Sequence, residues 1–541
     1  MAANTVHSVE IVFLILLAFI VVLANLARRL QIPYPIVLVI GGLVLGFVPG
    51  MPQVTLNPDM VFLVVLPPLL YAAAWTTSWR DFSYNLVSIT MLAFGMVGFT
   101  VLCVAVAAPF VFPGFDWQTG LVLGAVVSTT DAIAATSIAR RIRLPQRIVD
   151  ILEGESLVND ATGLLALEFG LSMLAKASHP TIALGLFRLL YLTAAGLVVG
   201  LLVGYVINWY ERSFEDAPVE IVITILVPYA AYLAAESIHA SGVLAVVSCG
   251  LYLSYRSNQL FSASVRIQVY SVWNALTFLF NGLVFVLIGL QLPYVLRSIE
   301  GYGLDELLVG AALFVALLIL LRLVWVYPGA YFAYFIRNRF FYQKDKPPPP
   351  KQVFVVAWTG MRGVVALAAA IALPRTRAGG APFTQRNLII FLTFSVIFVT
   401  LVLQGLTLPA LIRKLGLGSG EVSNIEEAEA RRSILEAVLE FLEERRVTND
   451  PRFAGIYEDV SRHYRHRLAS VTRDFSGVEG ATVEHLSHYR ALAVEIVSLQ
   501  RAKAVGLRNQ RKINDEVLRV LEYELDLEES RLAQEGSAAR A

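Results

Sequence analysis

The residues best suited to chemistry lie near the start of one apolar stretch, RIVDILEGESLVNDATGLLALEFG. Glu155 and Asn159 are four residues apart, as are Ser156 and Asp160, so all four side chains share one broad face of a helix. Together they offer two carboxylates, an amide and a hydroxyl, which are the hard oxygen ligands that a small hard cation prefers. A carboxyl group that is removed from water also retains a proton more readily. The pattern therefore predicts a site at which a proton and a cation can replace each other.

A second apolar stretch, LVLGAVVSTTDAIAATSIA, carries Asp131 near its middle, directly after Ser128, Thr129 and Thr130. An ionisable residue at the centre of a bilayer costs about 2.5–3.5 kcal/mol on insertion scales, so it persists where it is paired, hydrated or functional. A serine or threonine in a helix often bonds back to its own helix, but this does not account for the aspartate. The cluster predicts a locally unwound helix whose polar atoms face a cavity.

A third stretch, VFVVAWTGMRGVVALAAAIAL, carries Arg362 between Gly360 and Gly363. Glycine permits a break in a helix, and a buried guanidinium needs a partner whose geometry suits its planar fork. A carboxylate meets that need. We expect Glu155 to be the ion-pair partner of Arg362.

Composition shows what kind of elements must position these residues. The chain has 541 residues, of which 57% are hydrophobic and 16% are charged, and its net charge is +1. Soluble proteins carry about 25% charged residues. The composition excludes a disordered chain, a nucleic-acid binder and an ordinary soluble enzyme. The two cysteines, Cys103 and Cys249, lie in apolar runs and are expected to be core residues rather than a disulfide.

The apolar runs have the length that crosses a bilayer core of about 30 Å. They predict an all-α membrane protein with about 13 transmembrane helices. The predicted spans lie near 9–28, 35–50, 60–76, 84–109, 118–139, 147–174, 182–209, 218–237, 240–254, 267–292, 304–334, 352–374 and 386–412.

Basic residues concentrate in the loops that follow odd-numbered spans, such as Arg140–Arg147 and Arg337–Lys351. Because cytoplasmic loops carry the excess of Lys and Arg, the N-terminus is predicted outside and the C-terminus in the cytoplasm of a multi-pass cell-membrane protein. The loop from Arg375 to Arg386 is an exception.

The spans that contain Asp131 and Arg362 occupy corresponding positions in two halves of opposite orientation. This arrangement predicts an inverted repeat with two broken helices that cross at the middle of the membrane.

The composition changes near residue 416, and two domains are predicted, a transmembrane domain over 1–415 and a soluble helical tail over 416–541 in the cytoplasm. The tail is expected to contain a helix that ends at Asn449-Asp450-Pro451, a second helix near 453–473 and a long helix from about 482 to 533. Four histidines form two pairs at i, i+3 spacing, which leaves a pH sensor, a zinc site or solvated helix surface open. They are His463, His466, His485 and His488.

The segments LEGESLVNDATGLLAL, VSTTDAIAA and WTGMRGVVALAAAIALP resemble the NhaP-like and NHE-type monovalent cation:proton antiporters, the sodium/proton exchangers. The resemblance covers residues 9–413, and the GES-x-x-ND string is its most specific part. It implies that Asp160 binds the ion or the proton and that Asn159 before it accompanies electroneutral exchange. It also implies a homodimer. The ion shell that it implies comprises Asp160, Asp131, Glu155, Ser156, Thr130 and Asn159, with the carboxylates Asp160, Asp131 and Glu155 as Na+ ligands and Glu155 also bound to Arg362.

The predicted function is exchange of a monovalent cation, Na+ first, for H+ across the lipid bilayer, which would serve cytoplasmic pH and sodium homeostasis. No catalytic residue, enzyme activity, resident cofactor or nucleic-acid partner is expected; the transported Na+ or K+ and H+ are the ligands. A K+/H+ antiporter is the main alternative. A cation channel, which needs polar stripes along several spans, and a sensor that signals through the tail are weaker alternatives. The sequence leaves the tail's partner open.

Overall fold

The computed structural model describes residues 2–49, 57–112, 114–142, 144–174, 182–211, 216–297, 299, 303–341, 346–376, 382–417, 421–448, 454–472 and 483–510, with shorter pieces between 512 and 531. The chain separates into two compact units, Met1–Gly418 and Ser419–Ala541. Among the described residues the one extended pairing is an isolated bridge between Thr376 and Pro382, so the predicted all-α fold is confirmed.

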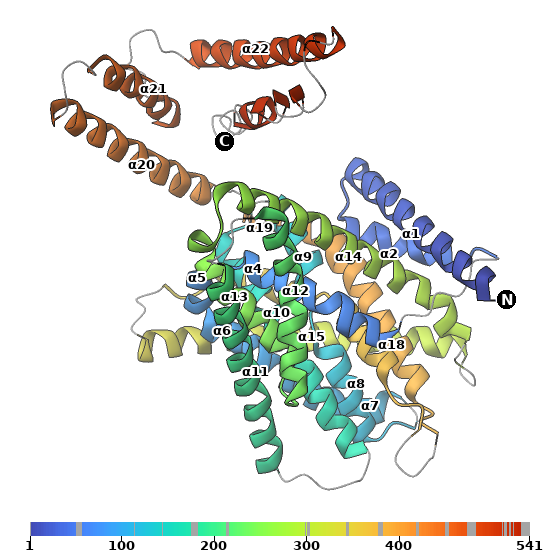
Figure 1. Ribbon diagram of the computed structural model, residues 1–541. Helices are drawn as coiled ribbons and strands as arrows, with labels where there is room; N and C mark the ends of the chain where they lie inside the picture. The colour runs from blue at the N-terminus through green and yellow to red at the C-terminus, as the bar shows by residue number, and fades with distance from the viewer. Residues whose placement is uncertain are drawn as a thin grey trace. The chain divides into compact units, whose positions relative to one another are not determined.

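The larger unit is a bundle of helices that differ in length (Figure 1). Its first half contains α1 (Ala2–Leu30), α2 (Tyr34–Gly46), α3 (Pro58–Met60), α4 (Leu66–Thr76), α5 (Trp79–Tyr84), α6 (Leu86–Thr90), α7 (Val97–Val111), α8 (Trp117–Ser128), α9 (Ala132–Arg141) and α10 (Gln146–Leu174). Its second half contains α11 (Ile182–Glu211), α12 (Ala217–Ser237), α13 (Gly242–Leu260), α14 (Ala263–Arg297), α15 (Leu304–Phe340), α16 (Pro350–Trp358), α17 (Val364–Ala372), α18 (Arg386–Val399) and α19 (Gly405–Leu415). Three π-helical turns, η1 (Val61–Val65), η2 (Met91–Met96) and η3 (Thr400–Gln404), connect α3 to α4, α6 to α7 and α18 to α19.

Nine helical segments among the described residues are long and apolar enough to cross a membrane. Two shorter apolar helices, Tyr34–Gly46 and Gly242–Arg256, coincide with two of the predicted spans. The predicted multi-pass architecture is therefore confirmed, whereas the number thirteen and the inverted repeat stay predictions.

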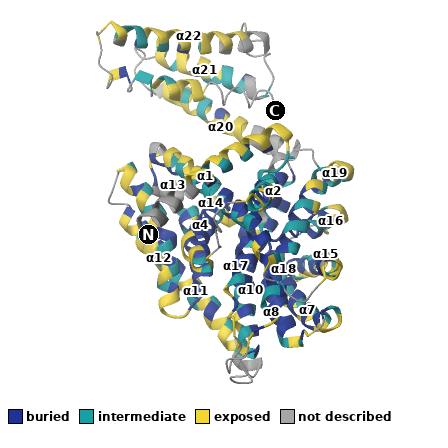
Figure 2. Cartoon of the chain, turned by 90° about the vertical axis from the view of Figure 1, so that its right-hand side faces the viewer, coloured by how far each residue is buried: buried dark blue, intermediate teal, exposed yellow. Residues whose placement is uncertain are grey.

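The helices divide into a buried set and a peripheral set (Figure 2). Most residues of α8 and α18 are buried, whereas α11 and α12 expose apolar side chains such as Leu190, Trp209 and Leu226. Apolar side chains on the outside of a helical bundle are what lipid tails require. The exposed apolar faces are therefore consistent with a protein surrounded by a bilayer.

One arginine of the loop from Arg375 to Arg386, which is an exception to the charge pattern, caps the C-terminal end of α17. Arg386, at the first turn of α18, donates from Nε to the carbonyl of Leu373 at 2.8 Å and from Nη2 to the carbonyl of Ile371 at 2.6 Å. These carbonyls lie at the C-terminal end of α17, where a helix leaves its last acceptors unsatisfied and favours positive charge. Arg386 therefore has a local structural role that does not depend on which side of the membrane it faces.

The smaller unit is helical, with α20 (Glu421–Thr448), α21 (Ala454–Thr472) and α22 (Val483–Asn509). The end of α20 falls directly before Asn449, as predicted. The single long helix expected from 482 to 533 is wrong, because α22 ends at Asn509. Arg501 binds Asp526 at 2.8 Å and Glu529 at 2.7 Å, which requires the chain to fold back on α22.

Candidate site at two crossing helix breaks

The first predicted break is present between α8 and α9. Helix α8 ends at Ser128, Thr129 is extended with φ −66° and ψ 138°, and α9 begins at Ala132. Ser128 bonds back to the carbonyl of Ala125 at 2.7 Å, as a helical serine commonly does. Thr130 and Asp131 therefore lie in the non-helical segment, where their backbone atoms are available to other partners.

The second predicted break is present between α16, which ends at Trp358, and α17, which begins at Val364. The two breaks meet: the amide of Asp131 donates to the carbonyl of Met361 at 2.9 Å. Gly363 permits this approach, because a Cβ there would lie 2.5 Å from the Cβ of Asp131. The two broken segments thus cross in direct contact.

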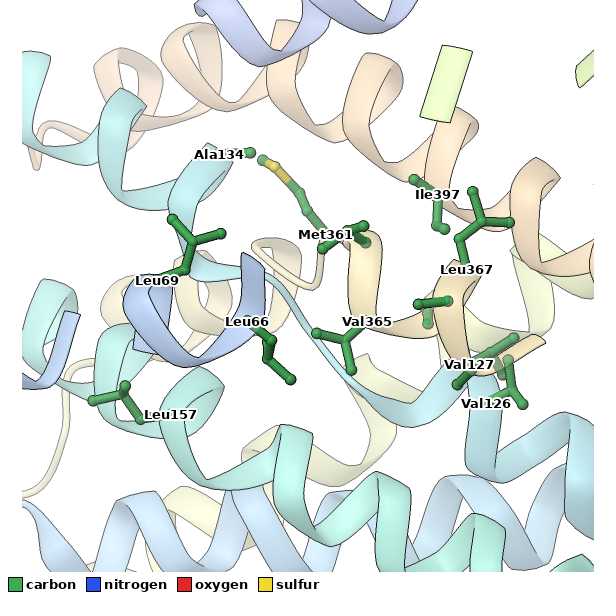
Figure 3. Close-up of a cluster of buried hydrophobic side chains, with 14 of the residues drawn as sticks. Leu66, Leu69, Val126, Val127, Ala134, Leu157, Met361, Val365, Leu367 and Ile397 are labelled. Atoms are coloured by element: carbon green, nitrogen blue, oxygen red, sulfur yellow. The ribbon is translucent and has the colours of Figure 1, made fainter. Parts of the chain in front are cut away.

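Buried apolar side chains surround the crossing (Figure 3). Met361 points toward Ala134 of α9 in this view, and the remaining side chains come from α4, α8, α10, α17 and α18. The labelled set is Leu66, Leu69, Val126, Val127, Ala134, Leu157, Met361, Val365, Leu367 and Ile397. The polar groups at the breaks are therefore enclosed by a hydrocarbon shell that strengthens their electrostatic interactions.

Helix α10 presents its polar face to the first break. Ser156 donates to the backbone carbonyl of Thr130 at 2.8 Å. The side-chain amide of Asn159 donates to the hydroxyl of Thr130, and that hydroxyl donates to Glu155 Oε1 at 3.1 Å. The structure therefore brings together four of the predicted residues: Glu155, Ser156 and Asn159 lie on one face of α10, and Thr130 of the first break meets that face.

Asp160 lies on the same face and is 7% exposed. Among the described residues, no group donates a hydrogen bond to its carboxylate, and Asp131 is close enough for the two carboxyl groups to repel each other. The amide oxygen of Asn159 and the hydroxyl of Thr129 are also buried without a partner in the described part of the chain. A buried carboxylate without donors is unfavourable unless a proton or a cation satisfies it.

The predicted ion pair between Glu155 and Arg362 is wrong, because the carboxylate of Glu155 binds a different arginine. Arg322 of α15 donates from Nη1 to Glu155 Oε1 at 2.6 Å and from Nη2 to Oε2 at 2.8 Å. Both side chains are 2% exposed, and Nη2 also reaches the carbonyl of Val356 at 3.2 Å. This is the bidentate geometry that a buried guanidinium–carboxylate pair needs.

Arg362 binds backbone carbonyls that the two breaks expose. Its Nε donates to Val127 at 2.6 Å and its Nη1 to Gly360 at 2.7 Å. Val127 belongs to the last turn of α8, whose carbonyls lack helical donors and carry partial negative charge. The cation therefore stabilises a helix end, and it does so without a carboxylate.

The predicted set of three Na+ ligands, Asp160, Asp131 and Glu155, is not assembled as such. The described residues contain no group of three His, Cys, Asp or Glu side chains that could hold one metal ion. Both oxygens of Glu155 are engaged by Arg322. The other two carboxylates of the set remain, and that of Asp131 accepts a hydrogen bond from the amide of Ile133 at 2.8 Å.

Two broken helices that cross beside a buried carboxylate are typical of secondary transporters, whose binding sites are formed by discontinuous helices. The family model described as "Sodium/hydrogen exchanger, transmembrane" matches residues 15–414, and the chain belongs to this sodium/hydrogen exchanger family.

Similar proteins share most of the chain. An uncharacterized Na+/H+ exchanger of Mycobacterium tuberculosis H37Rv is 34% identical, and the match covers 96% of each protein. A sodium, potassium, lithium and rubidium/H+ antiporter of Bacillus pumilus is 30% identical over 86% of this chain and 70% of that protein. A solved sodium proton antiporter of Methanocaldococcus jannaschii has the same fold, with a TM-score of 0.59 and 20% identity over 77% of this chain and all of that chain.

Proposed function

We propose that this chain is a monovalent cation/proton antiporter in which Asp160 alternately holds a proton and a cation. The observation that carries this proposal is the buried carboxylate of Asp160, to which no group in the described part of the chain donates a hydrogen bond. Membership of the exchanger family and the names of its relatives support the same activity. A transporter of this kind needs no resident cofactor, because the ions are its substrates.

The coupling follows from the cost of moving a charge through a medium of low dielectric constant. A bare Asp160 anion is costly to move across the membrane barrier, whereas the protonated or cation-loaded form carries less charge. Only the two occupied forms therefore move, and each cation that crosses is exchanged for a proton. Asn159 directly precedes Asp160 and is uncharged, so Asp160 is the one carboxylate at these two adjacent positions. This supports electroneutral exchange.

Na+ is the first candidate for the transported cation, and exchange of this kind would serve cytoplasmic pH and sodium homeostasis. K+ is the second candidate, and the Bacillus pumilus relative favours it, since its name includes potassium alongside sodium, lithium and rubidium. The oxygen atoms around Asp160 suit either ion chemically.

The same proposal includes the setting of the protein in the membrane. The excess of arginine after odd-numbered spans supports an N-terminus outside and a tail in the cytoplasm. A homodimer is proposed from the resemblance to the exchanger family. A channel or a tail-signalling sensor is less favoured, because polar groups of α10 and of the two helix breaks converge on one crossing that holds a buried carboxylate.

The test is cation-driven proton flux in proteoliposomes that contain the full chain, measured with a pH-sensitive dye and each alkali cation in turn. Asp160→Ala should abolish the flux for every cation. The matched control is Glu168→Gln, which changes an acid eight residues away on α10 that is half exposed and paired with Arg188. Flux in Asp160→Ala equal to that of the wild type would refute the assignment.

A further inference from the structure

A cavity of about 440 Å³ lies beside α5, a short helix that connects two consecutive membrane spans. The span before α5 ends at Thr76 and the span after it begins at Leu86, so α5 lies at the level of a membrane surface. The described residues that line the cavity all belong to α5, and they are Arg80, Asp81, Ser83 and Tyr84. None of them belongs to the crossing, so this cavity is separate from the proposed transport site.

Two arginines from other helices contact the aromatic wall of this cavity. The guanidinium carbon of Arg147, at the start of α10, lies 5.5 Å from the centroid of the Tyr84 ring. The guanidinium carbon of Arg337, near the end of α15, lies 5.9 Å from the same centroid. Both distances are within the range of cation–π attraction. Together with Arg80, these side chains bring three guanidinium groups from three helices to one cavity and its Tyr84 wall.

The positions of these arginines along their helices place the cavity at the depth of the lipid headgroups. Arg147 is the second residue of one membrane span, and Arg337 lies three residues before the end of another. Trp79, the first residue of α5, is exposed beside them, and tryptophan is enriched where a membrane meets water. A ligand in this cavity would therefore lie among headgroups rather than in the hydrocarbon core.

The charge at the cavity favours an anion. Asp81 is the acid among the described residues that line it, and Arg80 beside it is exposed. Asp150 and Glu153 lie about one and two turns further along α10 than Arg147, and Asp150 accepts a hydrogen bond within that helix. One carboxylate thus lines the cavity, against the guanidinium group of Arg80 and the two that contact its aromatic wall.

We propose that this cavity binds the phosphate group of an anionic phospholipid, with Arg80 and Arg147 as its charged ligands and the Tyr84 ring as its wall. The planar fork of a guanidinium group matches two phosphate oxygens. Basic pockets between membrane helices are suited to anionic headgroups. Trp79 and Leu86 expose apolar surface next to the cavity, and this surface can pack against the lipid's acyl chains. A free phosphate ion would gain nothing from that surface.

The bound lipid would contact two helices that otherwise have separate roles. Arg80 belongs to the connection between two spans, whereas Arg147 begins α10, the helix that carries Asp160. Helix α10 packs against α5 and α6, and α15 packs against α6. A phosphate held by both arginines would therefore fix the start of α10 against this connection.

The test is native mass spectrometry of the full chain, purified in detergent and depleted of lipid. Phosphatidylglycerol is added in graded amounts, and phosphatidylcholine with the same acyl chains is added in a parallel series. The first phosphatidylglycerol should bind at a concentration about tenfold lower than the first phosphatidylcholine. Arg80→Gln and Arg147→Gln should each raise that concentration about tenfold, the loss expected for one charge-assisted hydrogen bond. An excess of inorganic phosphate should leave the lipid bound.

The matched control is Arg339→Gln, which removes the same charge at the same end of α15. Arg339 is exposed, and it lies two residues after Arg337, so its side chain points to the other side of the helix. Equal binding of the two lipids, or equal loss in Arg80→Gln and Arg339→Gln, would overturn the proposal. Release of the lipid by inorganic phosphate would overturn the assignment to a phospholipid. No ion flux is measured, so these outcomes are distinct from failure of the antiport function.

Discussion

Among single residues, Glu155 of α10 and Arg322 of α15 form a buried bidentate ion pair beside the first helix break. The i, i+4 spacing was sufficient to place Glu155, Ser156, Asn159 and Asp160 on one face. The partner of Glu155 was missed, although an arginine within the apolar run LLILLRLVWV was a visible signal. Glu155 and Arg322 are 167 residues apart in the sequence. At such a separation the sequence does not show whether Arg322 or Arg362 contacts Glu155.

The buried ion pair makes a prediction about stability. Arg322→Met should destabilise the protein by about 3–5 kcal/mol, because it leaves the charge of Glu155 buried without a partner. The double variant Glu155→Gln, Arg322→Met should recover much of this loss. The readout is the loss of monodisperse protein on heating in detergent, with Arg188→Met in an exposed pair as the control, for which the expected change is about 0–1 kcal/mol. A single Arg322 variant as stable as the control would contradict this interpretation.

The bond from Ser156 to the carbonyl of Thr130 makes a smaller prediction. Ser156→Ala removes the part-buried hydrogen bond to Thr130 and should cost about 0.5–1.5 kcal/mol in stability. Because the same bond orients the first break, the cation concentration for half-maximal flux should rise while the protein remains folded. Ser172→Ala is the control, since its exposed hydroxyl bonds back to the carbonyl of Phe169 within α10. An unchanged cation dependence would show that this bond has no role in orienting the site.

At the scale of elements, the sequence predicted both helix breaks correctly but not the details of the helices around them. A polar cluster or a pair of glycines within an apolar run indicates a helix break, because such residues are typical of discontinuous transmembrane helices. The π-helical turns η1, η2 and η3 and the end of α22 were not predicted. A π turn adds one residue to a helical turn without changing composition, so it leaves no periodicity to detect.

The close contact of the two breaks makes a steric prediction. A Cβ at Gly363 would lie 2.5 Å from the Cβ of Asp131, so Gly363→Ala should force the crossing apart at a cost of about 1–3 kcal/mol. Flux in proteoliposomes should fall at least several-fold. Gly98→Ala in α7 is the matched control, because no atom lies within 4 Å of the added carbon. Equal flux in the two variants would mean that the crossing tolerates separation.

At the scale of the whole molecule, the chain separates into two compact units, Met1–Gly418 and Ser419–Ala541, and the predicted functional division near residue 416 stays a prediction. The family match covers residues 15–414 and therefore lies within the first unit. We propose that the first unit carries out transport and that the second is an accessory tail; the match does not indicate the partner of the tail.

We therefore expect a chain truncated after Gly418 to retain cation-driven proton flux within a few-fold of the full chain. The first unit contains every residue proposed to bind the ion, and the buried residues of the main hydrophobic core lie between Leu16 and Ile412. The control is Asp160→Ala in the same truncated chain, which should show no flux. Loss of flux from a truncated chain that is still inserted and monodisperse would favour the sensor alternative.

The joint between the two broken helices relies largely on main-chain atoms. The amide of Asp131 donates to the carbonyl of Met361, and within the described part of the chain the guanidinium of Arg362 donates to main-chain oxygens. Every amino acid carries a main-chain oxygen, and every one except proline carries the amide hydrogen. Contacts between main-chain atoms persist when the side chains around them are substituted. Substitutions near the crossing can therefore change which ion is carried while the two broken helices stay in contact.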